Sequence, residues 1–425
     1  MPVFALAGTA ALLLLLTLPV FLALIGGTFL SHAVFGPPVP AMVFAQQMVQ
    51  GVNKFALLAV PLFIYASAII SRGEIGKRLL ALVESFVGHI TGGMALATVV
   101  TCALFGALSG VGQAAIVSLG PLVFPVLLKQ GYSRGFAMGL ILTASTLAML
   151  IPPSVAMILY ALQATSSVES GFLAGLGAGL ILLTCLTVYA VAYARRHRIP
   201  GSPRQGWAGR ATALRGAGLA LGLPLIIFGG IYTGTFTPTE AAAGGCLYAI
   251  LVEVLIFRSL SLRELWSLTQ ETAGTISALL IILAAGAAMS YLLTLQQVPQ
   301  QVAGLLNDRS RFEILLIVNL TFLLAGMVLD PNSAIIVLTP IVLPAATAAG
   351  IDPVHFGAIV VLNIAIGMIT PPFGINIFTA MVTFRASYGE IVGALRPFIL
   401  VALIALALVT WGEALVMWLP RVLAG

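Results

Sequence analysis

Long apolar stretches separated by short polar segments make up most of the chain. Stretches of about 20 residues, the length that an α-helix needs to cross a bilayer, recur at positions 4–30, 53–70, 92–108, 113–128, 135–163, 171–193, 216–234, 237–257, 273–294, 312–329, 332–348, 354–384 and 397–419. The pattern predicts an all-α polytopic membrane protein. Two of the stretches, 135–163 and 354–384, are longer and each contains a Pro-Pro pair, which predicts a helix broken within the membrane.

The same arrangement of motifs occurs twice in the chain. The segments LGPLVFPVLLKQGYS and LTPIVLPAATAAGID align without a gap, 219 residues apart, and a Pro-Pro break follows each. At this spacing Pro121, Pro125, Gly131, Met149, Pro152 and Pro153 fall on Pro340, Pro344, Gly350, Met368, Pro371 and Pro372. A bilayer tolerates such breaks only where protein or a water-filled cavity surrounds them. Two matching breaks therefore predict the binding site of a secondary transporter.

Two segments between half-length apolar arms predict the tips of re-entrant hairpins. They are GALSGVGQ at 106–113 and GMVLDPNS at 326–333, opposite the breaks LIPPS at 150–154 and GMITPPFGIN at 367–376. Between the hairpins we expect five membrane crossings. Because this number is odd, the hairpins enter from opposite faces and form an inverted repeat. A parallel repeat needs an even number and leaves a poorer distribution of positive charge.

Composition and charge agree with a membrane protein. With 60% hydrophobic and 8% charged residues, the chain has too little polar surface for a soluble globule of 425 residues. The net charge of +6 does not indicate a nucleic-acid partner, because the basic residues lie in short loops between spans.

The distribution of positive charge predicts the topology. A linker between two spans carries an arginine cluster, which we place in the cytoplasm: Arg195, Arg196, Arg198, Arg204, Arg210 and Arg215. Most of the 19 Lys and Arg residues then lie on that side. The first hairpin is cytoplasmic and the second periplasmic, with a cytoplasmic N-terminus and a periplasmic C-terminus.

Several further features help to divide the chain. The first stretch lacks a basic segment before it and is too long for a signal sequence, so we expect a retained span. Residues 74–89 are amphipathic, and 299–312 precede the second hairpin in the corresponding place, which predicts two interfacial arms. Cys102, Cys185 and Cys246 are isolated in apolar segments and predict no disulfide or metal site.

We divide the chain into five segments on this basis. They are 1–91, with scaffold spans and the first arm; 92–165, the first repeat of a transport core; 166–311, with scaffold spans, the arginine-rich linker and the second arm; 312–385, the second core repeat; and 386–425, the C-terminal span.

The breaks offer ligands for a hard monovalent cation. Because Pro152 and Pro153 lack N–H groups, the carbonyls of Ala148 and Met149 are expected to be free, with the hydroxyls of Ser109 and Ser154 nearby. In the second repeat Pro371 and Pro372 free the carbonyls of Gly367 and Met368, and Thr370 and Asn376 add side-chain oxygens. We expect an alkali cation as the coupling ion, no cofactor and no transition metal.

Polar residues at the tips and breaks are the candidate substrate-binding residues, namely Ser109, Gln113, Asp330, Asn332 and Asn376. Asp330 is the carboxylate at a hairpin tip in the apolar core, where an unpaired charge costs at least a few kcal/mol. It is also a good N-cap for a helix that begins at Pro331, and the two roles are compatible. Half-helix N-termini near both tips would attract an anionic substrate.

Three other polar residues have structural explanations. Glu240 follows Thr237 and Pro238 in the arrangement of a capping box. His89 and His355 lie near span ends, where packed or interfacial histidines are more common than catalytic ones.

The order and spacing of these motifs resemble one family over nearly the whole chain. The matching segments are Ser109-Gly110 followed by GPLVFP, then IPPSVAMILY, FTPTEAAA, GMVLDPNSAIIVLTPIVLP, GIDPVHFG and TPPFGINIF. They are similar to the large membrane subunit, the DctM or M type, of tripartite ATP-independent periplasmic (TRAP) transporters, within the ion-transporter superfamily.

The resemblance implies sodium-driven uptake of an organic anion, usually a carboxylate, across the bacterial inner membrane by an elevator motion. The implied partners are a periplasmic substrate-binding protein and a four-helix Q-type subunit, which we expect as a separate chain because no such block precedes residue 53. Matched by motif, one sodium site would comprise Ser109, Gly110, Pro152, Pro153 and Ser154, and the other Gly326, Gly367, Thr370, Pro371 and Gly374.

The chain departs from the family pattern at Val111, where the family often has a second serine. One hydroxyl is therefore missing from the first tip, which bears on side-chain coordination and substrate contact there.

Three alternative functions follow from the same residues. An intramembrane serine protease would need Gly where this chain has Ala107, and no span offers a convincing partner histidine, so we do not expect an enzyme. A secondary anion carrier that works without a binding protein would share the hairpins and the repeat. Proton coupling would need a titratable group such as Asp330.

Overall fold

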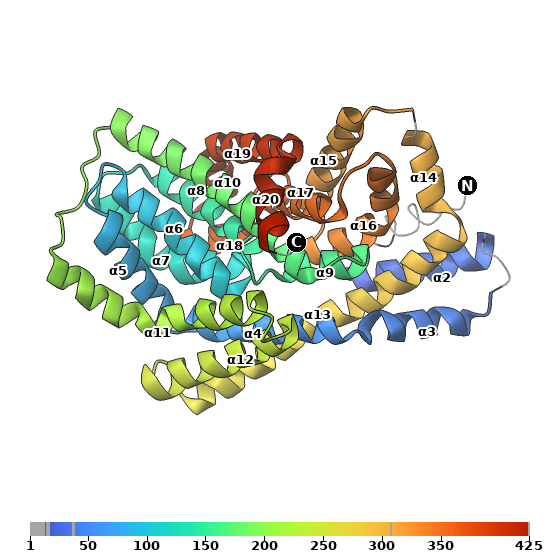
Figure 1. Ribbon diagram of the computed structural model, residues 1–425, viewed down its shortest axis with the longest axis horizontal. Coiled ribbons are helices and arrows are strands. Elements are labelled where there is room, and N and C mark those ends of the chain that lie inside the picture. The colour runs from blue at the N-terminus through green and yellow to red at the C-terminus, as the bar shows by residue number, and fades with distance from the viewer. Residues whose placement is uncertain (1–12, 14–17, 36–38, 307, 424–425) are drawn as a thin grey trace.

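The computed structural model describes residues 13, 18–35, 39–306 and 308–423, and every regular element in these ranges is a helix (Figure 1). The helices of the first half are α2 (Val20–Phe35), α3 (Ala41–Val52), η1 (Phe55–Leu58), α4 (Ala59–Arg72), α5 (Ile75–Val87), α6 (Gly93–Ser109), α7 (Gly112–Lys129), α8 (Arg134–Ser145), η2 (Thr146–Met149), α9 (Val155–Ala164) and α10 (Val168–Arg196). Those of the second half are α11 (Trp207–Tyr232), α12 (Pro238–Ile250), η3 (Leu251–Ile256), α13 (Leu262–Leu295), α14 (Val298–Leu306), α15 (Arg311–Val328), α16 (Pro331–Ala348), α17 (Pro353–Gly367), α18 (Ile375–Phe384), α19 (Tyr388–Trp411) and α20 (Glu413–Leu423).

The lengths of the helices confirm a membrane protein. Within the described ranges nine helices are long and apolar enough to cross a bilayer. The two predicted breaks divide two further apolar stretches into short helices, α8 with η2 and α9 in one case and α17 and α18 in the other. The predicted hairpins are α6–α7 and α15–α16, whose tips lie at Gly110 and Asp330.

Helices of the two repeats pack against each other. The second arm of each hairpin packs on the second half of the other repeat's broken helix, α7 on α18 and α16 on α9. The equivalent helices α10 and α19 pack against each other. Between the hairpins lie the broken helix α8–α9 and then α10, α11, α12 with η3, and α13. This odd number of crossings makes the repeat inverted, as predicted.

Helices outside the hairpins and breaks form a frame around them. The 34-residue α13 is the longest helix and packs against α2, α3, α4 and α16. In Figure 1 it runs diagonally below the hairpin α15–α16, with α3 beside it. Helix α12 packs on α4, and α3 packs on α13. The division into a moving core and a fixed scaffold stays a prediction.

The first predicted arm is a helix. Its N-terminus is held by Glu253, a fully buried carboxylate that accepts hydrogen bonds from the backbone N–H groups of Glu74 and Ile75, each at 3.0 Å. Ser259 donates to the same carboxylate. A β-carbon on Gly73 would overlap with it. Arm α5 is therefore anchored to η3, a short π-helix that follows α12.

The second arm is shorter than predicted. Helix α14 ends at Leu306, and a new helix, α15, begins at Arg311 after a capping box formed by Ser310 and Glu313. The interruption separates the end of the predicted arm, residues 310–312, from its beginning.

Two spans also differ in position from the prediction, and one helix is additional. The last long helix begins at Tyr388, after a capping box formed by Ser387 and Glu390, and ends before Gly412, so the span predicted at 397–419 is wrong in position. Helix α11 begins at Trp207, which places Arg210 and Arg215 on a helix rather than in the linker. Helix α3 was not predicted. Most of the first predicted stretch, 4–30, lies outside the described residues.

Candidate functional site

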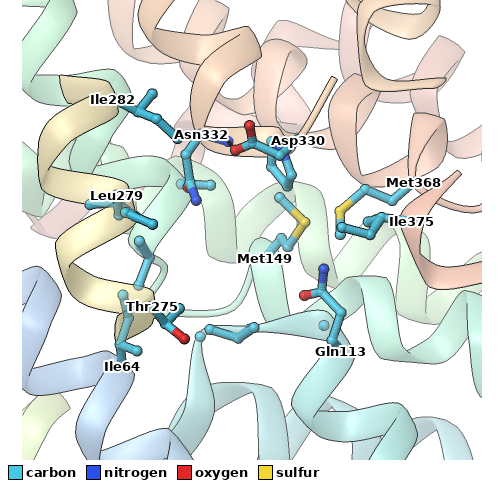
Figure 2. Close-up of a pocket in the computed structure, with 17 residues that line it drawn as sticks. Ile64, Gln113, Met149, Thr275, Leu279, Ile282, Asp330, Asn332, Met368 and Ile375 are labelled. Atoms are coloured by element: carbon cyan, nitrogen blue, oxygen red, sulfur yellow. Dashed lines mark hydrogen bonds between the residues drawn. The ribbon is translucent and has the colours of Figure 1, made fainter. Parts of the chain in front are cut away.

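A cavity of about 410 Å³ lies where both hairpin tips, both breaks and two frame helices meet (Figure 2). Hairpin tips and breaks supply most of its lining, namely Gly110, Val111, Gly112, Gln113, Met149, Val155, Ala156, Asp330, Pro331, Asn332, Met368 and Ile375. The opposite wall is formed by Ile64 of α4 and by Thr275, Ala278, Leu279 and Ile282 of α13. The volume is within the range of small-molecule sites.

The first hairpin tip fits tightly against the first break. Gly110 has φ +63°, in the left-handed region, and a β-carbon there would overlap with the carbonyl oxygen of Pro153. One turn earlier, a β-carbon on Gly106 would lie 2.6 Å from the α-carbon of Ala148. The small residues of this tip therefore allow direct contact between two backbones.

The first break is fully packed. Pro152 and Pro153 are buried, and the peptide bond between them is cis. The Ser154 hydroxyl accepts a hydrogen bond from the Met157 N–H at 3.1 Å, which caps α9, and donates to the Met149 carbonyl. The Met149 oxygen is thus already hydrogen-bonded, which differs from the expectation of a free carbonyl. The Ala148 carbonyl cannot receive a helical hydrogen bond, because Pro152 has no N–H.

The second break has the same close approach. A β-carbon on Gly367 would lie 2.5 Å from the carbonyl carbon of Gly326. Gly374, at φ +37°, lies next to two carbonyl oxygens, and a β-carbon there would be 2.8 Å from that of Met368 and 2.9 Å from that of Thr370. The end of α15, the segment after α17 and the start of α18 therefore lie close together.

The carbonyls of the second break are also hydrogen-bonded. The Thr370 N–H donates to the Gly367 oxygen at 2.9 Å, and the Asn376 N–H donates to the Met368 oxygen at 3.0 Å. The expectation that Pro371 and Pro372 leave these oxygens without partners is wrong. Each carbonyl oxygen has a second lone pair, so one hydrogen bond does not prevent cation binding. The set of cation ligands stays a prediction.

The two breaks differ in exposure despite their common design. Pro372 and Phe373 are exposed and Pro371 is partly exposed, whereas the whole first break is buried. The difference continues along the following helices. Phe378 of α18 is 47% exposed, while Leu159, at the equivalent position of α9, is 0% exposed. The first break and the helix after it are therefore buried, whereas the second break and its helix are partly exposed.

Apart from Thr275 of α13, the polar side chains that line the cavity come from the start of α7 and α16. Gln113 and Asn332 occupy the second position of these helices and are equivalent at the repeat spacing of 219 residues. Asp330 is the N-cap of α16 and accepts hydrogen bonds from the N–H groups of Asn332 and Ser333, both at 3.1 Å, and from the Ser333 hydroxyl. The capping role expected for Asp330 is confirmed.

The structure brings about a third of the predicted site residues to the cavity itself, six of eighteen. Gly110, Gln113, Met149, Asp330, Asn332 and Met368 line it. The remaining predicted residues, Ser109, Ala148, Pro152, Pro153, Ser154, Gly326, Gly367, Thr370, Pro371, Pro372, Gly374 and Asn376, lie in the adjoining tips and breaks. The wall of α4 and α13 was missed, because the largely apolar pattern of these helices does not mark the face that borders a cavity.

Asn376 has an unusual environment. It is fully buried, and neither amide atom has a hydrogen-bond partner among the described residues. Its amide nitrogen would lie 3.5 Å from a β-carbon on Gly112, so it faces the start of α7, next to the cavity. A buried amide without partners is costly, which makes it a candidate ligand-binding group.

The other polar residues considered from the sequence have structural roles. Glu240 and Thr237 form the predicted capping box of α12. His355 is buried and its Nε2 atom is 2.8 Å from the Val409 carbonyl.

Residues 7–415 match the family described as "Tripartite ATP-independent periplasmic transporter, DctM component". The chain belongs to the DctM family.

Relatives of this DctM chain carry several substrate names. It is 43% identical over 399 residues to the ectoine/5-hydroxyectoine TRAP transporter large permease protein UehC of Ruegeria pomeroyi, with 93% of both chains covered. It is 39% identical to the ectoine TRAP transporter large permease protein TeaC of Halomonas elongata, again with 93% of both covered. It is 36% identical to the C4-dicarboxylate TRAP transporter large permease protein DctM of Pseudomonas aeruginosa, with 87% of both covered.

A solved structure shares the fold of this DctM chain. The YdaH transporter of Alcanivorax borkumensis superposes with a TM-score of 0.66 at 15% identity and covers 97% of this chain and 98% of its own. At this identity the likeness concerns the fold alone.

Proposed function

We propose that this DctM-family subunit carries out sodium-coupled uptake of a carboxylate-bearing organic solute across the bacterial inner membrane. The cavity between the hairpin tips and the frame helices α4 and α13 is the observation that carries the proposal. Its volume suits a small organic solute. Because the cavity borders both breaks, the solute and the coupling ion would lie close together.

The proposed ion sites are the two breaks. At each of them a glycine allows a hairpin backbone to approach the broken helix, Gly110 at Pro153 and Gly326 at Gly367. Backbone and hydroxyl oxygens are the neutral ligands that suit sodium. An ion between hairpin and broken helix would hold the two together, and the solute would then bind to a completed tip.

The proposed transport step is an elevator motion, in which the hairpins and broken helices move as a core against α4 and α13. The wall that these two helices present to the cavity is largely apolar, with Ile64, Ala278, Leu279 and Ile282. Such a surface has few hydrogen bonds to break as the core slides. The exposed second break and the buried first break are consistent with a core that is open toward one side of the membrane.

The proposed partners are a small four-helix membrane subunit and a periplasmic substrate-binding protein. The family description, a component of a tripartite periplasmic transporter, supports this assignment. We place the arginine-rich segment after α10 in the cytoplasm, together with the N-terminus, and the C-terminus in the periplasm.

Uptake into proteoliposomes tests the proposal. The large subunit would be reconstituted with its small subunit, and uptake of radiolabelled solute would be followed with and without the binding protein under a sodium gradient, a potassium gradient or a pH gradient. The proposal predicts uptake only with the sodium gradient and the binding protein. Uptake that persists without sodium and follows the pH gradient would instead indicate proton coupling, and uptake without the binding protein would indicate a free-standing carrier.

A further inference from the structure

The two ends of the cavity are equivalent in position but not in charge. The amide side chains of Gln113 and Asn332 are matched by the repeat, and so are the N-cap residues that precede them, Val111 and Asp330. One N-cap is therefore an apolar side chain and the other a carboxylate. Figure 2 shows Asp330 and Asn332 at one end of the cavity and Gln113 at the other.

The Asp330 end is negative. Its carboxylate accepts the hydrogen bonds of the first turn of α16, so that helix N-terminus is already occupied by an internal anion. Among the described residues Asp330 forms no ion pair. A carboxylate has about four acceptor positions, and three hydrogen bonds reach this one. One position remains for a donor on a ligand.

The Val111 end favours an anion. No side chain caps α7 after Val111. At the start of α18, by contrast, the Asn376 N–H already donates to the Met368 carbonyl. These two helices pack on each other, with the buried and unpartnered amide of Asn376 between their first turns. Uncapped N–H groups and the positive end of the helix dipole bind carboxylates well. The unpartnered amide adds a donor on the same side.

The rest of the lining carries no compensating charge. In the described part of the chain, Asp330 is the one charged residue that lines the cavity, and no Lys, Arg or His does. A ligand with two carboxylates would place one of them near Asp330, where two like charges repel. Apolar side chains such as Ile64, Leu279 and Val155 would contact the uncharged part of a ligand.

We propose that the cavity selects a zwitterion, whose carboxylate binds at the start of α7 and whose ammonium or amidinium group binds Asp330. This inference rests on the transport function proposed above and narrows its solute class. Val111 contributes to this selectivity. Because it has no hydroxyl to cap α7, the N–H groups at the start of that helix are left for the ligand carboxylate.

Ligand binding to the purified complex of large and small subunits tests the selectivity. The probes are ectoine, whose ring carries one carboxylate and one amidinium, and succinate, a dicarboxylate, each titrated calorimetrically in sodium chloride. The decisive variant is Asp330→Asn, because asparagine caps helices as well as aspartate does. It therefore removes the charge but keeps the cap. We expect ectoine affinity to fall about 10- to 100-fold, the effect of losing one hydrogen bond to a charged group, while succinate affinity is unchanged or rises.

Asp352→Asn is the matched control. Asp352 caps α17 before a proline, as Asp330 caps α16, and accepts from the N–H groups of Val354 and His355, but it does not line the cavity. We expect this variant to bind ectoine like the wild type. Val111→Asp would place a carboxylate at the other end, and we expect it to abolish ectoine binding.

Three results would overturn the zwitterion assignment. The first is that the wild-type protein binds succinate but not ectoine. The second is that the Asp330→Asn variant loses affinity for both ligands equally. The third is that this variant loses affinity for neither ligand. Sodium-dependent binding of succinate alone would overturn this assignment and leave the proposed transport function intact. Absence of any sodium-dependent binding would contradict both.

Discussion

A β-carbon on Gly367 would lie 2.5 Å from the carbonyl carbon of Gly326, so the second hairpin and the second broken helix meet backbone to backbone. No side chain larger than hydrogen fits between them. A similar close contact occurs in the first repeat, where the small residue is Gly106 of the hairpin and its neighbour is Ala148. These contacts set the distance between each hairpin and its break, and with it the geometry of the proposed ion sites.

Replacing Gly367 by alanine is expected to destabilise the protein by about 1–3 kcal/mol, the usual effect of overpacking, and to abolish sodium-dependent uptake. Thermal unfolding and uptake measure the two effects. Gly389→Ala is the control, because Gly389 is also helical and has open space around it. Uptake by Gly367→Ala at the wild-type rate would show that the close contact is not needed.

Replacing Gly110 by alanine is expected to abolish uptake for a similar reason. The new β-carbon would overlap with the Pro153 carbonyl oxygen and displace the tip from the break. Gly131→Ala separates this effect from backbone strain, since Gly131 also has positive φ, at +95°, but nothing lies within 4 Å of its β-carbon position. We expect Gly131→Ala to lower stability slightly and to transport normally. Equal loss of uptake in both variants would assign the effect to strain.

Replacing Glu253 by glutamine is expected to loosen the first arm. The amide nitrogen of glutamine cannot accept from the N–H of Glu74 or Ile75, so one buried donor loses its partner, at about 1–3 kcal/mol. Glu271→Gln is the control, because the ion pair of Glu271 with Arg72 is exposed and worth at most about 1 kcal/mol. Thermal unfolding measures both. Equal effects of the two variants would argue against an anchor at Glu253.

Alternating access predicts that equivalent positions of the two repeats exchange exposure. In a background without Cys102, Cys185 and Cys246, Phe378→Cys is expected to react with a water-soluble maleimide faster than Leu159→Cys, following the exposures of 47% and 0%. Sodium with a transported solute should speed the reaction of Leu159→Cys and slow that of Phe378→Cys. Rates that do not respond to sodium and solute would contradict a core that moves between two states.

Much of the architecture could be predicted because proline and glycine act through the backbone. The pairs Pro152-Pro153 and Pro371-Pro372 marked both breaks, and the Asp330-Pro331 pair marked a tip and its cap. Helix ends set by capping boxes, such as that at Ser387, were missed within a hydrophobic pattern that continues past them.

The remaining features depend on packing that the sequence does not encode locally. Ile64 and Leu279 border the cavity, although nothing distinguishes them from other apolar residues of their helices. The hydrogen bonds to the carbonyls of Met149 and Met368 come from Ser154 and Asn376, the last residue of each break. Proline removes one donor, and the chain supplies another from the following helix.

Sodium binding to the two breaks is tested most directly by the thermal stability of the purified complex in sodium chloride and in choline chloride at equal concentration. A ligand that binds the folded state raises its stability by RT ln(1 + [L]/Kd). The account predicts a higher Tm in sodium, a smaller sodium effect in Ser154→Ala and in Thr370→Val, and none in the double variant. Equal Tm values of the wild type in the two salts, or a full sodium effect in the double variant, would contradict it.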